Sequence, residues 1–240
     1  MQRIKRTEVD GVIARNFSFL IKDSRAGIAF VLLFISWLAI CMTVIGTTSF
    51  QSTYGHHTLL INQVTDVSIS SYLSGLDFGL IVFVAFLIFV YSIGVLVLAK
   101  GGNKGTKPFT EAAKRYPSLL VSSIFFFFIV FILMFALFIP SVFAFVKMIF
   151  YPQESLLKKR NPVAALHASY DFTSGKFWSV FGLVAGIMLI SLAFSIIITF
   201  VAHVSLGAFI VLDSLLWAFI TVFFVGAMTE YFLEEQKNVR

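Results

Sequence analysis

Two ionisable residues, Lys147 and Asp213, lie inside apolar stretches of the sequence and are the first candidates for chemistry. At the rise of an α-helix, each is about 9 Å from the same end of its stretch. A charge in lipid is costly, and an opposite charge at the same depth lowers that cost. We therefore predict an intramembrane ion pair, which would either lock two helices together or form a polar element in a substrate or ion path. A lysine whose ammonium reaches up to the membrane surface is the other interpretation of Lys147.

The sequence lacks the motifs of common hydrolases and nucleotide-binding enzymes. It contains no Gly-x-Ser-x-Gly, no His-Glu-x-x-His and no phosphate-binding P-loop. His56 and His57 are adjacent, so their side chains point in different directions and are not expected to hold a metal ion together. We expect a non-enzymatic protein with no cofactor and no metal site.

Composition indicates a membrane protein. Of the 240 residues, 59% are hydrophobic and 12% are charged, and the mean hydropathy is +0.94. A water-soluble domain of this length needs more polar surface. The net charge of +6 does not indicate nucleic acid, because the basic residues are grouped in short segments between apolar runs. This grouping is typical of topology signals and of attraction to anionic lipid headgroups, so membrane lipids are the expected partners.

The apolar runs are long enough for transmembrane helices. We predict an all-α fold, a polytopic transmembrane helical bundle of about six spans forming a single domain over residues 26–240. The long run over 118–151 exceeds one crossing, and Pro140 suits a sharp turn within it, so we expect a helical hairpin there; one kinked helix is the alternative. The expected spans are 26–48, 75–99, 118–139, 141–156, 177–201 and 207–229.

Lysine and arginine predict the orientation. They occur in 1–25, 100–117, 152–176 and the C-terminal tail, and are missing from 49–74 and 202–206. The positive-inside rule then places both termini in the cytoplasm. Residues 1–25 are expected to form a cytoplasmic, interfacial amphipathic helix or to dock on cytoplasmic loops, with the apolar stripe Val9, Ile13, Phe17 and Leu20.

Small-residue spacing indicates where helices approach closely. Gly182 and Gly186 form a GxxxG pattern, and Gly75 and Gly79 form another. We expect these glycines to line packing faces inside the bundle rather than a dimer interface.

Residues 161–178 carry strong local signals for a short helix. Asn161 is a suitable N-cap and Pro162 a suitable first residue, while Gly175 favours an end to the helix. We expect this helix to lie flush with the inner membrane surface, with Lys176 and Trp178 anchoring the next span.

This region resembles uncharacterised bacterial inner-membrane proteins of the YciC-like type, and the membrane domain attached to some glycerophosphoryl diester phosphodiesterases. The resemblance implies an α-helical membrane domain of the bacterial inner membrane with a role in envelope or lipid homeostasis. We expect no catalytic phosphodiesterase domain within residues 1–240, so the resemblance does not imply that activity. The matching positions are Pro140, Pro162, Ala165, Leu166, Ser169, Thr173, Gly175, Lys176 and Trp178.

Two functions therefore stay open. The first is a non-enzymatic accessory subunit of a larger membrane protein complex, or a component that organises lipid or envelope. The alternative is a transporter or permease subunit whose polar site lies near Lys147 and Asp213, since discontinuous helices often build transport sites.

Overall fold

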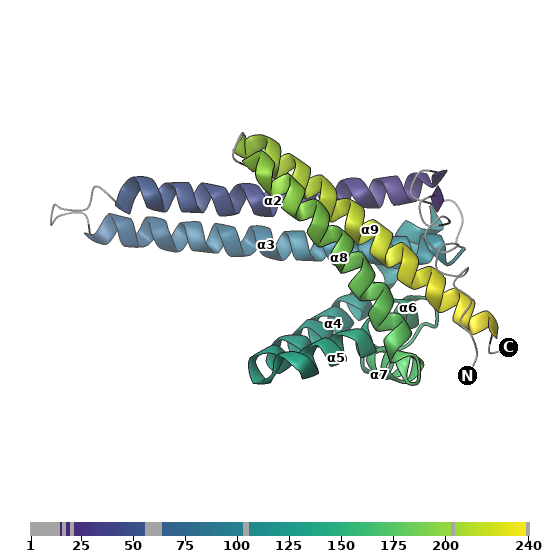
Figure 1. Cartoon of the computed structure of the whole chain (residues 1–240). Helices are drawn as coiled ribbons and strands as arrows, with labels where there is room; N and C mark the ends of the chain where they lie inside the picture. The colour runs from purple at the N-terminus through teal and green to yellow at the C-terminus, as the bar shows by residue number, and fades with distance from the viewer. Residues whose placement is uncertain are drawn as a thin grey trace.

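The computed structural model describes Arg15, Ser18, Phe19 and residues 22–55, 64–102, 106–202 and 205–238. All regular elements in these residues are helices, which confirms the all-α prediction (Figure 1). The predicted N-terminal stripe of Val9, Ile13, Phe17 and Leu20, and the pair His56 and His57, lie outside the described residues. The helices are α2 (Ser24–Gly55), α3 (Val64–Lys100), α4 (Lys107–Ala136), α5 (Phe138–Met148), α6 (Tyr151–Leu156), α7 (Pro162–Thr173), α8 (Phe177–Ala202) and α9 (Leu206–Asn238).

Five helical segments in the described part of the chain are long and apolar enough to cross a membrane. Large apolar side chains cover their surfaces; Phe135 is 75% exposed, Ile139 81% and Phe200 69%. Water-soluble proteins do not expose apolar surface on this scale, whereas lipid tails cover it without cost. The chain is an integral membrane protein. The five segments are Ser24–Met42, Phe78–Lys100, Lys107–Phe135, Phe177–Phe200 and Gly207–Lys237.

The chain after α4 turns back on it, which confirms the hairpin over the single kinked helix. The Phe126 ring lies 5.6 Å from the Phe145 ring and 4.9 Å from the Tyr151 ring, measured between centroids. The Tyr151 hydroxyl is hydrogen-bonded to Ser123 Oγ at 2.9 Å. The turn is at Leu137, which is extended (φ −161°, ψ 129°), and not at Pro140. Pro140 is in the first turn of α5, where the N–H that proline lacks is not needed.

The returning limb is too short to be the expected span over 141–156. It is divided into α5, of 11 residues and about 16 Å, and α6, of six residues. Pro152 explains the division, because it cannot donate the helical hydrogen bond to the carbonyl of Met148. Residues 151–156 are all buried in protein rather than exposed to lipid. The described residues therefore contain five long spans and a short return limb, rather than about six spans.

The helices form three pairs that meet at one end of the molecule. In Figure 1, the α8–α9 pair crosses the α2–α3 pair, and the α4–α5 hairpin lies below them. The α9 helix packs on α2 and α3, while α5 packs on α4 and α7. Leu96, Phe150 and Phe232 are among the largest fully buried side chains, and each lies close to the shared end. The protein core is thus at this end, and the exposed apolar surface extends away from it.

The predicted glycine packing faces are not supported. A Cβ atom added at Gly79, Gly182 or Gly186 would meet nothing within 4 Å, so no neighbouring helix approaches these positions. The contacts around Gly75 are outside the part of the chain whose side-chain surroundings the structure describes. The close approach occurs instead at Gly94 of α3, where an added Cβ would be 3.1 Å from Leu119 Cδ2 of α4.

Candidate functional site

Lys147 and Asp213 have separate partners, so the predicted ion pair is wrong. The Lys147 ammonium donates a hydrogen bond to Ser174 Oγ (3.1 Å) and lies 4.7 Å from the centroid of the Tyr170 ring. Asp213 Oδ2 accepts a hydrogen bond from the indole N–H of Trp37 (3.1 Å). Within the described residues, no ion pair joins Lys147 to Asp213.

The fold explains why Lys147 needs no carboxylate. Lys147 is in the last turn of α5, and its partner Ser174 is the C-cap of α7. The C-terminal carbonyl groups of both helices carry partial negative charge, which stabilises a cation there. The Tyr170 ring adds a cation–π contact. Lys147, although only 7% exposed, is therefore compensated by dipoles and an aromatic face.

We expect the substitutions Lys147→Met and Asp213→Asn to change the free energy of unfolding independently. Their effects should add within about 0.5 kcal/mol, because the two side chains share no partner. A double-mutant cycle, measured by SDS titration in mixed micelles, checks this. Lys100 and Glu230, whose charged atoms are 3.0 Å apart, form the coupled reference pair. A Lys147–Asp213 coupling as large as that of the reference pair would contradict our assignment.

The short helix expected at 161–178 is present as α7, with Pro162 as its first residue. Gly175 follows it with a φ of 82°, a conformation that strongly favours glycine. Lys176 forms an ion pair with Glu235 of α9, and Trp178 is 78% exposed. The buried face of α7 is formed by Ala165, Leu166, Ala168, Ser169 and Thr173.

The two hydroxyl groups of this face complete the hydrogen bonding at the break between α5 and α6. Ser169 Oγ accepts a hydrogen bond from the Phe150 N–H (3.0 Å) and donates one to the Lys147 carbonyl (3.2 Å). Thr173 Oγ1 also lies 3.2 Å from that carbonyl. A broken helix in a membrane protein requires such partners, because no water satisfies the freed backbone groups. These two motif residues therefore have a structural role.

Replacing Ser169 by alanine is expected to lower the free energy of unfolding by about 1–3 kcal/mol, because the buried Phe150 N–H loses its acceptor. Thr199→Ala is the control, since Thr199 is exposed on α8 and bonds only within its own helix. SDS titration of both variants in mixed micelles gives the comparison. Equal stabilities of the two variants would show that Ser169 does not support the break.

Ion pairs join the basic segments of the chain to acidic residues at the shared end. Lys100 of α3 lies 3.0 Å from Glu230 of α9, and Arg15 pairs with both Glu230 and Glu234. The hydrogen bond that Arg15 donates to Glu230 raises the pKa of the Arg15 guanidinium above its ordinary value. The distribution of lysine and arginine predicts the basic segments, but these carboxylates were missed, although the sequence Glu-Tyr-Phe-Leu-Glu-Glu at 230–235 is rich in acidic residues. The α9 helix thus links Arg15 to α3.

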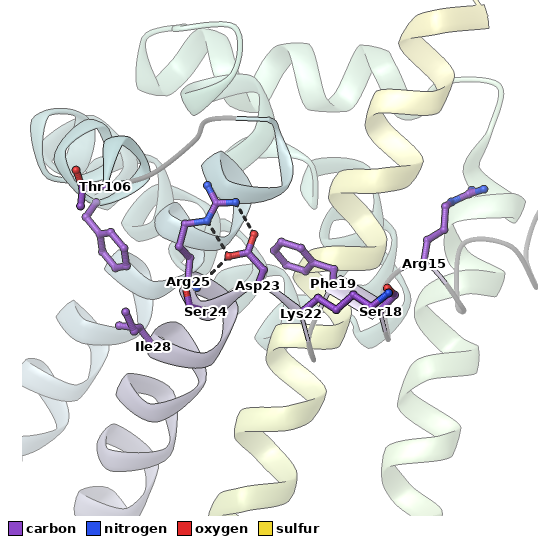
Figure 2. A pocket seen from close by; sticks show the side chains of 10 residues that line it. Arg15, Ser18, Phe19, Lys22, Asp23, Ser24, Arg25, Ile28 and Thr106 are labelled. Atoms are coloured by element: carbon purple, nitrogen blue, oxygen red, sulfur yellow. Dashed lines mark hydrogen bonds and ion pairs between the residues drawn. The ribbon is translucent and has the colours of Figure 1, made fainter.

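A pocket of about 730 Å³ opens at this end, between the N-terminal segment and the starts of α2 and α4. Figure 2 shows Arg15 at one end of the pocket, Thr106 at the other and the Asp23–Arg25 pair between them. Apolar side chains also line it, and Ile28, which is 48% exposed, belongs to the first membrane span. The lining of the pocket therefore combines charged and polar side chains with apolar ones. Its lining is Arg15, Ser18, Phe19, Lys22, Asp23, Ser24, Arg25, Ile28, Thr106 and Phe109.

Among the described residues, Lys22 is the cation of the pocket that forms no ion pair. Asp23 Oδ1 accepts hydrogen bonds from the Arg25 backbone N–H (2.9 Å) and guanidinium Nε (2.7 Å). Arg25 thereby holds the pKa of the Asp23 carboxyl below its ordinary value, so this pair stays ionised and neutral overall. Arg15 is shared with two glutamates, while the exposed Lys22 forms no ion pair with any described residue.

Comparison of the chain with protein-family models, curated proteins and solved structures finds no match. Among the described residues, no group of three or more histidine, cysteine, aspartate or glutamate side chains could hold a metal ion. The pocket thus combines an exposed cation with apolar side chains in one lining.

Proposed function

We propose that this integral membrane protein is non-enzymatic and binds an anionic phospholipid in the pocket at the end shared by the three helix pairs. This end is called the basic end below. The observation that carries this proposal is that one pocket is lined both by Lys22 and by Ile28, which belongs to the first span. A lipid phosphate there would pair with Lys22, and an acyl chain would run along Ile28 and Phe109. Charge-assisted hydrogen bonds to phosphate are strong, and each lysine near an anionic membrane surface contributes about 1 kcal/mol to binding.

We propose that the basic end faces the cytoplasm, with both termini there, in a bacterial inner membrane. The Lys/Arg-rich segments converge on this end through Lys100, Lys176 and Arg15 and their carboxylate partners. The positive-inside rule favours the cytoplasmic side for such a cluster. The resemblance to YciC-like proteins supports the same membrane and a role in lipid or envelope organisation.

An accessory role in a larger membrane complex is compatible with lipid binding. The α8 helix packs mainly on α9 and exposes most of its apolar length, including the open Gly182 position. The transporter alternative relied on a shared polar site of Lys147 and Asp213, and these residues lie apart. The transporter alternative also relied on a broken helix, and the break between α5 and α6 has its backbone groups hydrogen-bonded by Ser169 and Thr173, which favours a structural role for it.

The test is lipid retention after reconstitution in nanodiscs that contain phosphatidylglycerol or phosphatidylcholine. We expect native mass spectrometry to find one retained phosphatidylglycerol on the wild-type protein and about tenfold weaker retention on Lys22→Glu, because the charge in the pocket is reversed. Lys107→Glu is the matched control: Lys107 is exposed at the start of α4 but does not line the pocket. An equal loss of phosphatidylglycerol retention in both variants would show that general surface charge causes the effect, and would contradict the proposal.

A further inference from the structure

A second polar group lies where α2 and α9 pack on each other, far along both helices from the basic end. Asp213 of α9 is only partly buried and accepts the indole N–H of Trp37 of α2 at 3.1 Å. The Trp37 and Trp217 rings are 5.3 Å apart between centroids, with 36° between their planes. A carboxyl group and two indole rings are therefore gathered at one helix crossing.

This carboxyl group has no cationic partner among the described residues. Its neighbours on α9 face outward: Leu212 is 39% exposed, Leu215 37% and Trp217 40%. A carboxylate with one neutral donor in apolar surroundings is poorly compensated and attracts a cation. Indole faces attract cations as well, through their quadrupole. The carboxyl group and the indole rings therefore both favour a cationic ligand.

The depth of the site indicates which cation can reach it. The stretch of α9 from Asp213 to Glu230 is about 25 Å long at the helical rise. Glu230 is fixed at the basic end by Arg15 and Lys100. Because the hydrocarbon core is about 30 Å thick, Asp213 lies in the half of the core opposite the basic end, within about a helical turn or two of that boundary. Tryptophan is typical of that boundary.

We propose that Asp213, Trp37 and Trp217 bind the primary ammonium group of an aminophospholipid in the leaflet opposite the basic end. A small metal ion is not favoured, because it requires several oxygen ligands and no acidic cluster surrounds Asp213 in the described part of the chain. A primary ammonium donates to the carboxylate while its methylene groups lie against the indoles. This site differs from the basic pocket in ligand charge, leaflet and residues, so either site can fail without the other.

The experiment compares lipid retention by the full-length protein in nanodiscs of phosphatidylethanolamine, phosphatidylcholine and phosphatidylglycerol. Asp213→Asn removes the charge but keeps an oxygen that accepts the Trp37 N–H, so the helix crossing is preserved. We expect the wild-type protein to retain one phosphatidylethanolamine and Asp213→Asn to retain it at least fivefold less, with phosphatidylglycerol retention unchanged. Trp217→Leu should also weaken phosphatidylethanolamine retention.

Asp171→Asn is the matched control, since Asp171 is an exposed aspartate of α7 paired with His167. Circular dichroism and SDS titration establish that each variant is folded. The proposal is overturned by equal phosphatidylethanolamine retention in wild type and Asp213→Asn, or by an equal loss in Asp171→Asn. It is also overturned if Asp213→Asn releases a co-purifying protein and leaves the bound lipid unchanged, because the carboxylate would then pair with a partner helix.

Discussion

Replacing Phe150 by alanine is expected to lower the free energy of unfolding by about 3–5 kcal/mol, the usual range for a large aromatic side chain deleted from a close-packed core. Phe150 is 0% exposed and lies between α5 and α6. Its ring centroid is 5.0 Å from that of Phe172 of α7 and 5.9 Å from that of Phe232 of α9. The substitution therefore removes a contact shared by the return limb, α7 and α9. SDS titration in mixed micelles, followed by circular dichroism, measures the change.

Phe135→Ala is the control for that prediction. Phe135 is 75% exposed near the tip of the α4–α5 hairpin, so lipid replaces the contacts that the shortened side chain loses. We expect a change within about 1 kcal/mol. Equal destabilisation by Phe150→Ala and Phe135→Ala would contradict a protein core at the basic end.

Glu230→Gln is expected to cost about 3 kcal/mol, because breaking a buried ion pair leaves an uncompensated charge behind. The side chains of Glu230 and Lys100 are 10% and 12% exposed, so little water replaces the lost interaction. Arg15 loses a partner at the same time, which weakens the hold on the N-terminal segment. The measurement is again SDS titration, combined with limited proteolysis of the N-terminal segment.

Glu234→Gln provides the comparison for the second prediction. Glu234 also pairs with Arg15, but the side chains are 39% and 54% exposed. Ion pairs in water contribute at most about 1 kcal/mol, so this variant should stay close to wild type. If Glu234→Gln destabilised the protein as much as Glu230→Gln, burial would not be the source of the effect.

The helices could be predicted because each apolar run is long enough to satisfy its own backbone in lipid. The α7 helix was predicted from local signals, since Pro162 starts a helix and Gly175 ends one without help from distant residues. The position of the hairpin turn was less predictable. Pro140 marks the first turn of α5 rather than the bend itself, because proline is tolerated where no N–H is needed.

Partners between helices could not be predicted, because they depend on which helices are neighbours. Their equal depth in the membrane suggested that Lys147 would meet Asp213. Depth does not show which helices are neighbours, however, and α5 packs on α7 while α9 packs on α2. The same limit applies to glycines. The Gly182 and Gly186 spacing is on an open face, while Gly94, which has no such spacing, is the close contact between α3 and α4.

The basic end was partly predictable. The distribution of Lys22, Lys100 and the other basic residues gave the correct grouping, because membrane insertion keeps such segments on one side. The pocket itself was not predictable, because it forms between segments that are distant in the sequence, the start of α2 and the start of α4 at Thr106.

The most direct test of the lipid-binding account is a phosphorus-to-nitrogen distance measurement by solid-state NMR in phosphatidylglycerol bilayers. A phosphate paired with Lys22 places its phosphorus about 4 Å from the ammonium nitrogen. The account predicts strong dephasing of the Lys22 signal by lipid phosphorus and weak dephasing of the exposed Lys107 signal, which senses only passing lipids. Equal dephasing at Lys22 and Lys107, or none at Lys22, would contradict a lipid held in the pocket.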